Sequence, residues 1–86
     1  MTFEDAFSSQ EYRYTLGIES QTGQHYISIP VSNSLVDYDE YYAIDPVLFN
    51  RLQQQPEAAI AFAEKCRNRE LDELLMIKPG RDRGTG

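Results

Sequence analysis

Residues 12–31 read YRYTLGIESQTGQHYISIPV and contain the clearest structural pattern in this chain. Apolar and polar residues alternate over residues 12–18 and again over 25–31, as is typical of two half-buried β-strands. The apolar faces would be formed by Tyr12, Tyr14, Leu16 and Ile18 in the first strand and by Ile27, Ile29 and Val31 in the second. Ser20-Gln21-Thr22-Gly23 between them has turn chemistry, because glycine adopts a positive φ without strain. The segment therefore predicts an antiparallel hairpin, with Pro30, which has no N–H to donate, at a strand end or on an edge.

Two helices are predicted after this hairpin. Asp45-Pro46 is a good helix start, because the carboxylate can accept hydrogen bonds from free amides and proline at the first position loses none. This helix should end near Gln54, since the next residue precedes a proline. Pro56 then opens a second helix that runs to about Asn68. Its inward stripe would consist of Ala59, Ile60, Ala63 and Cys66.

The remaining segments carry weaker patterns. Residues 1–10 are polar except for Phe3 and Phe7, which predicts a loosely held lead-in. Residues 35–44 have two interpretations, a third strand of the sheet or an ordered loop. Residues 71–77 could prolong the second helix or return as a strand, and we expect a short helical continuation that leads into an extended end.

These elements predict an α+β domain over residues 1–80, in which an antiparallel hairpin, with or without a third strand, packs against two C-terminal helices. Eighty-six residues leave no room for a second core. Residues 81–86 are expected to form a flexible polar tail, because Pro79-Gly80 stops regular structure before them.

The net charge of −6 limits the classes of partner. It argues against nucleic acids and anionic membranes, both of which attract cations, and it favours a basic protein. The alternative is that this charge only keeps a small domain soluble. The acidity is concentrated in residues 1–64, where ten acidic residues face only Arg13 and Arg51.

The sequence also indicates a compartment. Cys66 is the only cysteine, so no internal disulfide can form, as is usual in a reducing cytoplasm. The first residues are acidic and lack the apolar core of a signal peptide, and the apolar runs are too short to span a bilayer. We expect a cytoplasmic protein whose oligomeric state the sequence leaves open.

The candidate functional residues lie between Val36 and Ala43, where Asp37-Tyr38-Asp39-Glu40-Tyr41-Tyr42 places three carboxylates and three tyrosines in six consecutive positions. Carboxylates attract and orient a basic partner, while tyrosines supply contact area at low side-chain entropy cost. We predict that these six residues form a partner-binding surface, with Glu19 and Asp45 as outlying contacts. The alternative is a solvated loop whose tyrosines pack into the core, and of the three tyrosines Tyr42 is the one most expected to be buried.

Catalytic and metal sites find little support. The single histidine, His25, has no orienting carboxylate nearby in sequence, and Cys66 lies on an alanine-rich helical face. The chain has no Gly-x-Ser-x-Gly motif and no glycine-rich phosphate loop. A calcium loop that begins at Asp37 would need glycine and glutamate where Tyr42 and Leu48 stand. We therefore expect neither an enzyme nor a cofactor or metal site.

This acidic-aromatic stretch, which continues into Ala43-Ile44-Asp45-Pro46, and the general character of the chain resemble the immunity proteins of bacterial toxin systems such as contact-dependent growth inhibition. The resemblance implies stoichiometric inhibition of a basic, nuclease-type toxin domain, with the acids occupying the cleft that otherwise holds phosphates. Two other classes stay open. One is an acidic adaptor or regulatory subunit of a cytosolic complex, and the other is a small enzyme that uses His25 with a carboxylate.

Overall fold

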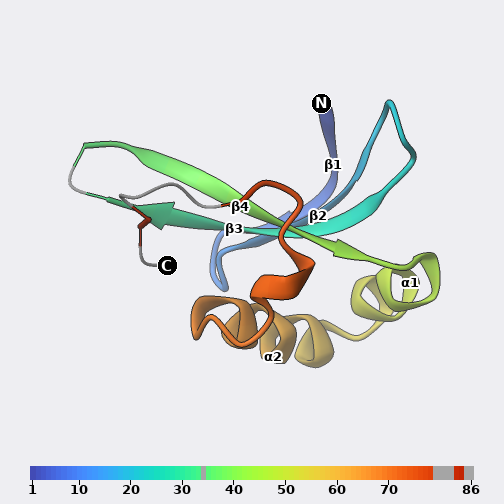
Figure 1. The fold of residues 1–86 in the computed structure, drawn as a ribbon. Helices are drawn as coiled ribbons and strands as arrows, with labels where there is room; N and C mark the ends of the chain where they lie inside the picture. Colours follow the sequence, from blue (N-terminus) through green and yellow to red (C-terminus); the bar gives the residue numbers. More distant parts are fainter. Residues whose placement is uncertain (34, 79–82, 85–86) are drawn as a thin grey trace.

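The computed structural model describes residues 1–33, 35–78 and 83–84. Within these residues the chain forms a four-stranded antiparallel sheet in the order β1-β2-β3-β4, followed by two α-helices (Figure 1). The predicted α+β class is therefore confirmed. The strands are β1 (Phe3–Ser9), β2 (Tyr14–Glu19), β3 (His25–Ser32) and β4 (Asp37–Ile44). The helical elements are α1 (Pro46–Gln54), α2 (Pro56–Arg67) and the short 3-10 helix η1 (Asp72–Leu74).

The predicted hairpin forms the two inner strands of the sheet. Leu16 of β2 lies opposite Ile27 of β3, and Gly23 in the connecting turn has a φ of 74°. β2 begins at Tyr14, two residues later than the alternation suggested, because Arg13 adopts a left-handed φ of 56°. The placement of Tyr12 on the inward face is wrong, since this residue lies in the turn before β2 and is 45% exposed.

Pro30 lies inside β3, opposite Asp39 of β4. The pairing of β3 with β2 extends only as far as Ser28, opposite Thr15. Beyond that pair β3 has a strand neighbour on one side only. Pro30 therefore sits at a local edge, where the missing N–H interrupts no ladder.

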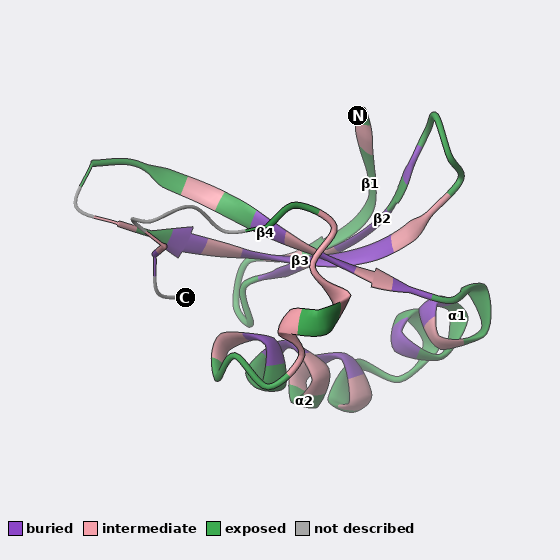
Figure 2. Ribbon diagram, viewed as in Figure 1, coloured by how far each residue is buried: buried purple, intermediate pink, exposed green. Residues whose placement is uncertain are grey.

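The N-terminal segment is not the loosely held lead-in that its sequence suggested. β1 pairs with β2 along its length. Phe3 lies opposite Glu19 at one end and Ser9 lies opposite Tyr14 at the other, and the register is irregular between Asp5 and Phe7. Its side chains are mostly exposed on both faces (Figure 2), so the strand lacks the apolar alternation that identifies a half-buried strand. β1 is held by its backbone ladder and by the contacts of Phe3 and Asp5 with distant strands, neither of which is visible as an alternation of residue types.

The helix boundaries agree with the sequence. The Asp45 carboxylate accepts a hydrogen bond from the Leu48 N–H at 2.7 Å and so caps α1, which ends at Gln54.

After η1 the chain is extended. Leu75 forms a β-bridge with Tyr42, and the Met76 N–H donates to the Tyr41 carbonyl at 2.8 Å. This segment lies along the outer edge of β4, as the expected extended end does. The expected continuation of the second helix does not form, because α2 ends at Arg67, Arg69 has a left-handed φ of 59° and η1 is a separate 3-10 turn.

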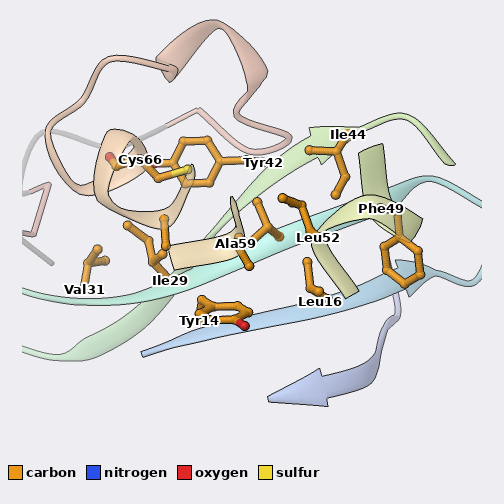
Figure 3. Close-up of a cluster of buried hydrophobic side chains, with 12 residues drawn as sticks. Tyr14, Leu16, Ile29, Val31, Tyr42, Ile44, Phe49, Leu52, Ala59 and Cys66 are labelled. Atoms are coloured by element: carbon orange, nitrogen blue, oxygen red, sulfur yellow. Dashed lines mark hydrogen bonds between the residues drawn. The ribbon is translucent and has the colours of Figure 1, made fainter. Parts of the chain in front are cut away.

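The core lies between the helices and one face of the sheet (Figures 1 and 3). Each large apolar side chain buried there stabilises the fold by roughly 1.5–3 kcal/mol. The buried core residues are Tyr14, Leu16, Ile27, Ile29, Val31, Tyr42, Ile44, Phe49, Leu52, Ala59, Ala63 and Cys66. Ile60, expected on the same helical stripe, is only partly buried against this cluster.

Of the predicted tail, residues 81–82 and 85–86 lie outside the described residues. The other two, Arg83 and Gly84, are held against the domain: the Arg83 guanidinium pairs with Glu40 and Asp72. The prediction of a flexible tail is therefore wrong for these two residues. Along residues 1–33, 35–78 and 83–84, no helix has the length and apolar character needed to cross a membrane.

Candidate functional site

The acidic-aromatic stretch forms β4, so its side chains alternate between the two faces of the sheet. The strand interpretation of this segment is confirmed. The residues on the helix-covered face are Tyr38, Glu40 and Tyr42, and those on the opposite face are Asp37, Asp39 and Tyr41. The six residues therefore do not form one surface, and only half of them lie on the uncovered face.

Glu40 and Tyr42 belong to the interior. Tyr42 is fully buried, and its hydroxyl donates to Glu40 Oε1 at 3.0 Å and to the Cys66 carbonyl at 3.2 Å. Burial, and then the nearby Glu40 carboxylate, raise the pKa of Tyr42. Glu40 is 6% exposed and pairs with Arg83. Neither residue lies on the uncovered face: Tyr42 is buried in the core, as was expected most for this tyrosine, and Glu40 is covered by Arg83, whereas Tyr38 is half-buried.

Glu19 is also interior, so it does not supply an outlying contact. Its carboxylate accepts hydrogen bonds from the Thr2 N–H at 2.9 Å, from the Gln21 N–H at 3.0 Å, and from the N–H and hydroxyl of Thr22 at 2.9 and 2.7 Å. These bonds lower the pKa of Glu19 to about 2. Glu19 thus ties the N-terminus to the β2–β3 turn. Asp45 is exposed, but it caps α1 beyond the end of β4, away from Asp37 and Asp39.

We call the sheet face opposite the helices the open face. Its centre is filled by three aromatic rings from three strands, Phe3 of β1, Tyr26 of β3 and Tyr41 of β4. Phe3 stacks on Tyr41 with centroids 3.7 Å apart, and Tyr26 meets both rings edge-on at 5.3 and 5.1 Å. Tyr26 has no exposed surface, whereas Phe3 and Tyr41 are half-buried and present part of their area to solvent.

Exposed carboxylates lie on the same face as these rings. Asp5 Oδ1 accepts a hydrogen bond from the Tyr26 hydroxyl at 2.7 Å, and Asp37 accepts one from the Ser32 hydroxyl at 2.6 Å. Partial burial, and then the charge of Asp5, raise the pKa of Asp39. The four described strands contain no lysine or arginine. The negative charge of the open face is therefore not neutralised by neighbouring strands.

A groove of about 380 Å³ adjoins Asp39, at the corner where β2 is shorter than β3. Its lining is mostly polar, and Ser8 and Thr15 share a hydrogen bond between their hydroxyls at 3.0 Å. Arg13 also lines this groove. Such a groove can receive one side chain of a partner that lies on the open face.

The candidate catalytic residues stand apart from this face. His25 is half-buried, and its ring meets the ring of Phe49 edge-on with centroids 4.7 Å apart. Burial raises the pKa of the Cys66 thiol to about 12, which makes it a weak nucleophile. Among the residues that the structure describes, His, Cys, Asp and Glu side chains form no group of three or more suited to a metal ion.

Sequence reasoning found Asp37, Asp39 and Tyr41 but missed the other half of this surface. Asp5 and Tyr26 are 21 residues apart and meet only because β1 folds back on the hairpin. The position of Tyr26 between His25 and Ile27 did carry a signal, since alternation places it on the face opposite Ile27.

Searches of protein-family models, of curated proteins and of solved structures found no match to this chain. The fold and the open face define a small α+β protein with an acidic, aromatic sheet surface.

Proposed function

We propose that this protein binds a basic protein partner through the open face, and that it acts as a cytoplasmic immunity protein that neutralises a nuclease-type bacterial toxin by forming a stoichiometric complex. One observation carries the proposal. Asp5, Asp37 and Asp39 are exposed on a sheet face whose strands hold no lysine or arginine, and the same face carries the stacked rings of Phe3 and Tyr41.

The physical chemistry of this face supports a cationic protein as the ligand. Uncompensated carboxylates accelerate association with a basic surface and pair with its lysines and arginines. Arginine also stacks on aromatic rings, which the exposed parts of Phe3 and Tyr41 offer. In a nuclease the same cationic groups would hold phosphates, so occupying them inhibits the enzyme.

The size of the domain is compatible with such an interface. Its accessible surface is 5525 Å², and an ordinary complex buries about 800 Å² on each partner, roughly one seventh of that surface. A rigid sheet face requires little rearrangement on binding, which keeps the entropic cost of association low.

The first experiment identifies the partner by pull-down from the native host and measures its affinity and association rate. Reversing Asp37 and Asp39 to lysine should weaken binding by about a hundredfold and slow association, with little change in folding stability. The matched control is Glu57→Lys with Glu70→Lys, which makes the same change in charge at exposed positions outside the sheet. Equal losses in the two variants, or no loss, would refute the open face as the site.

The nature of the captured protein tests the second part of the proposal. A basic nuclease that loses activity at one equivalent of this protein supports the immunity function. A partner without such activity contradicts that function and favours an adaptor or regulatory role for the same face.

A further inference from the structure

A second surface of β4 holds an arginine in a specific site. The guanidinium of Arg83 donates to Glu40 through Nε at 2.8 Å and Nη2 at 3.1 Å. It donates to Asp72 of η1 through Nη1 at 2.6 Å and Nη2 at 2.8 Å. Each carboxylate is therefore bound by two parallel N–H groups, a geometry that the point charge of a lysine does not reproduce.

One of the two carboxylates is also held by the core. Glu40 is fixed by the Tyr42 hydroxyl, which also bonds to the Cys66 carbonyl in the core. The side chains of Arg83 and Glu40 are 12% and 6% exposed. Hydrogen bonding to Arg83 lowers the pKa of Asp72, so the charged form of this carboxylate is favoured while the guanidinium is bound.

The residue after the arginine is recognised as well. The Gly84 N–H donates to the Tyr38 hydroxyl at 2.7 Å, and its carbonyl accepts from Arg69 Nη2 at 3.3 Å. A Cβ at this position would lie 2.5 Å from the carbonyl oxygen of Ser32, which is closer than real contacts allow. The site therefore selects glycine by close backbone approach.

We propose that Glu40, Asp72, Tyr38 and the Ser32 backbone form a binding site for an Arg-Gly peptide segment, which Arg83-Gly84 fill in this chain and which an Arg-Gly segment of another protein can fill in their place. Among the described residues, the dipeptide is held only through the side chain of Arg83 and the backbone of Gly84. None of these contacts depends on how the dipeptide is joined to the rest of the chain. The inference does not depend on the function proposed for the open face.

The chain's own segment competes with any external one. A tethered ligand acts at an effective concentration in the millimolar range, so an external dipeptide binds weakly while Arg83 is in place. Removing the Arg83 side chain frees the two carboxylates and removes the hydrogen bonds that anchor the dipeptide, so an external Arg-Gly segment can displace Gly84 from Tyr38.

The test uses the full chain with Arg83→Ala and the synthetic dipeptide acetyl-Arg-Gly-amide at millimolar concentrations. We expect the dipeptide to bind the variant saturably and to raise its melting temperature by several degrees. Its affinity for the unchanged chain should be at least tenfold lower. Acetyl-Lys-Gly-amide and acetyl-Arg-Ala-amide are the matched control ligands and should bind at least tenfold more weakly. A folded variant that ignores the Arg-Gly dipeptide, or that binds the lysine dipeptide equally well, overturns the proposal.

The same ligand keeps the test decisive if Arg83→Ala does not fold alone. The dipeptide should then restore folding, and failure to do so counts against the site. Arg83→Lys provides a second variant, because it retains a cation beside Glu40 but not the paired N–H geometry. Arg83→Lys should bind acetyl-Arg-Gly-amide more tightly than the unchanged chain does. Equal affinities of the two proteins would contradict the inference.

Discussion

Phe3 stacks on Tyr41 with ring centroids 3.7 Å apart, although these residues lie on the two outermost strands of the sheet. In a flat sheet, three strand spacings would separate their backbones by about 14 Å, since neighbouring strands lie about 4.8 Å apart. The contact therefore requires a sheet that curls toward the open face, in keeping with the twist of short antiparallel sheets. Tyr26 is enclosed beneath the two rings, so the open face has a small aromatic core of its own.

This relationship makes Phe3 important for stability although β1 is mostly exposed. Replacing Phe3 by Ala should lower the free energy of unfolding by about 1–3 kcal/mol, because it removes the stack and uncovers Tyr26. Urea unfolding followed by circular dichroism measures the change. Phe7→Ala is the control on the same strand, where the ring is 47% exposed. Equal losses for the two variants would contradict the role assigned to the stack.

Gly17 provides the space in which Tyr26 lies. A Cβ at Gly17 would collide with the Tyr26 ring and hydroxyl and with the Glu4 carbonyl. Gly17→Ala should therefore destabilise the protein by about 1–3 kcal/mol and change the near-ultraviolet circular dichroism of the tyrosines. The comparison is Gly23→Ala, where the surrounding space is open and only the φ of 74° is unfavourable. Gly23→Ala should leave the tyrosine spectrum unchanged. If Gly17→Ala also left it unchanged, Gly17 would not be needed to make room for Tyr26.

The parts of the fold that could be predicted are those with local signals. The alternation around Leu16 and Ile27 identified the hairpin, and Asp45-Pro46 and Pro56 identified both helix starts. β1 was missed because most of its side chains are exposed and show no apolar alternation, while its backbone pairing and the stack of Phe3 on Tyr41 join residues far apart in sequence. The contacts of Arg83 near the C-terminus were missed for a related reason. Its partners Glu40 and Asp72 are 43 and 11 positions away in sequence.

The prediction of the candidate site was incomplete, and the main reason is the geometry of one strand, β4. Treating residues 37–42 as one surface ignored the two-residue period of a strand, which sends Glu40 and Tyr42 into the interior. Once β4 is recognised as a strand, that period separates the exposed acids from the buried ones. The contribution of Asp5 was not accessible in this way, because it depends on the pairing of β1 with β2.

Glu19 makes folding stability depend on pH in the acidic range. Its pKa in the folded protein is about 2, below the ordinary value of 4.5, so the unfolded chain binds more protons between these values. The contribution of Glu19 is therefore present in full above about pH 5 and is lost as the pH falls toward 2. Glu19→Gln should lower the melting temperature by several degrees at pH 7, and this difference should shrink steadily between pH 5 and pH 2.

Thermal unfolding across this pH range measures the effect of Glu19. Glu11→Gln is the control, because Glu11 is exposed in the turn before β2 and should change stability by less than about 0.5 kcal/mol. A difference between the unchanged chain and Glu19→Gln that is independent of pH would show that the hydrogen bonds do not require the carboxylate charge.

The Cys66 thiol should be protected from chemical modification as long as the domain is folded. It is buried in the core, where desolvation raises its pKa to about 12, so the reactive thiolate is scarce at pH 8 as long as the domain is folded. A disulfide reagent such as Ellman's should therefore react with the native protein only as fast as the protein opens, and at once in strong denaturant. Ala61→Cys places a second thiol at an exposed position of α2 and serves as the internal control. This variant should show one fast and one slow equivalent; two fast equivalents would mean that α2 does not hold Cys66 against the sheet.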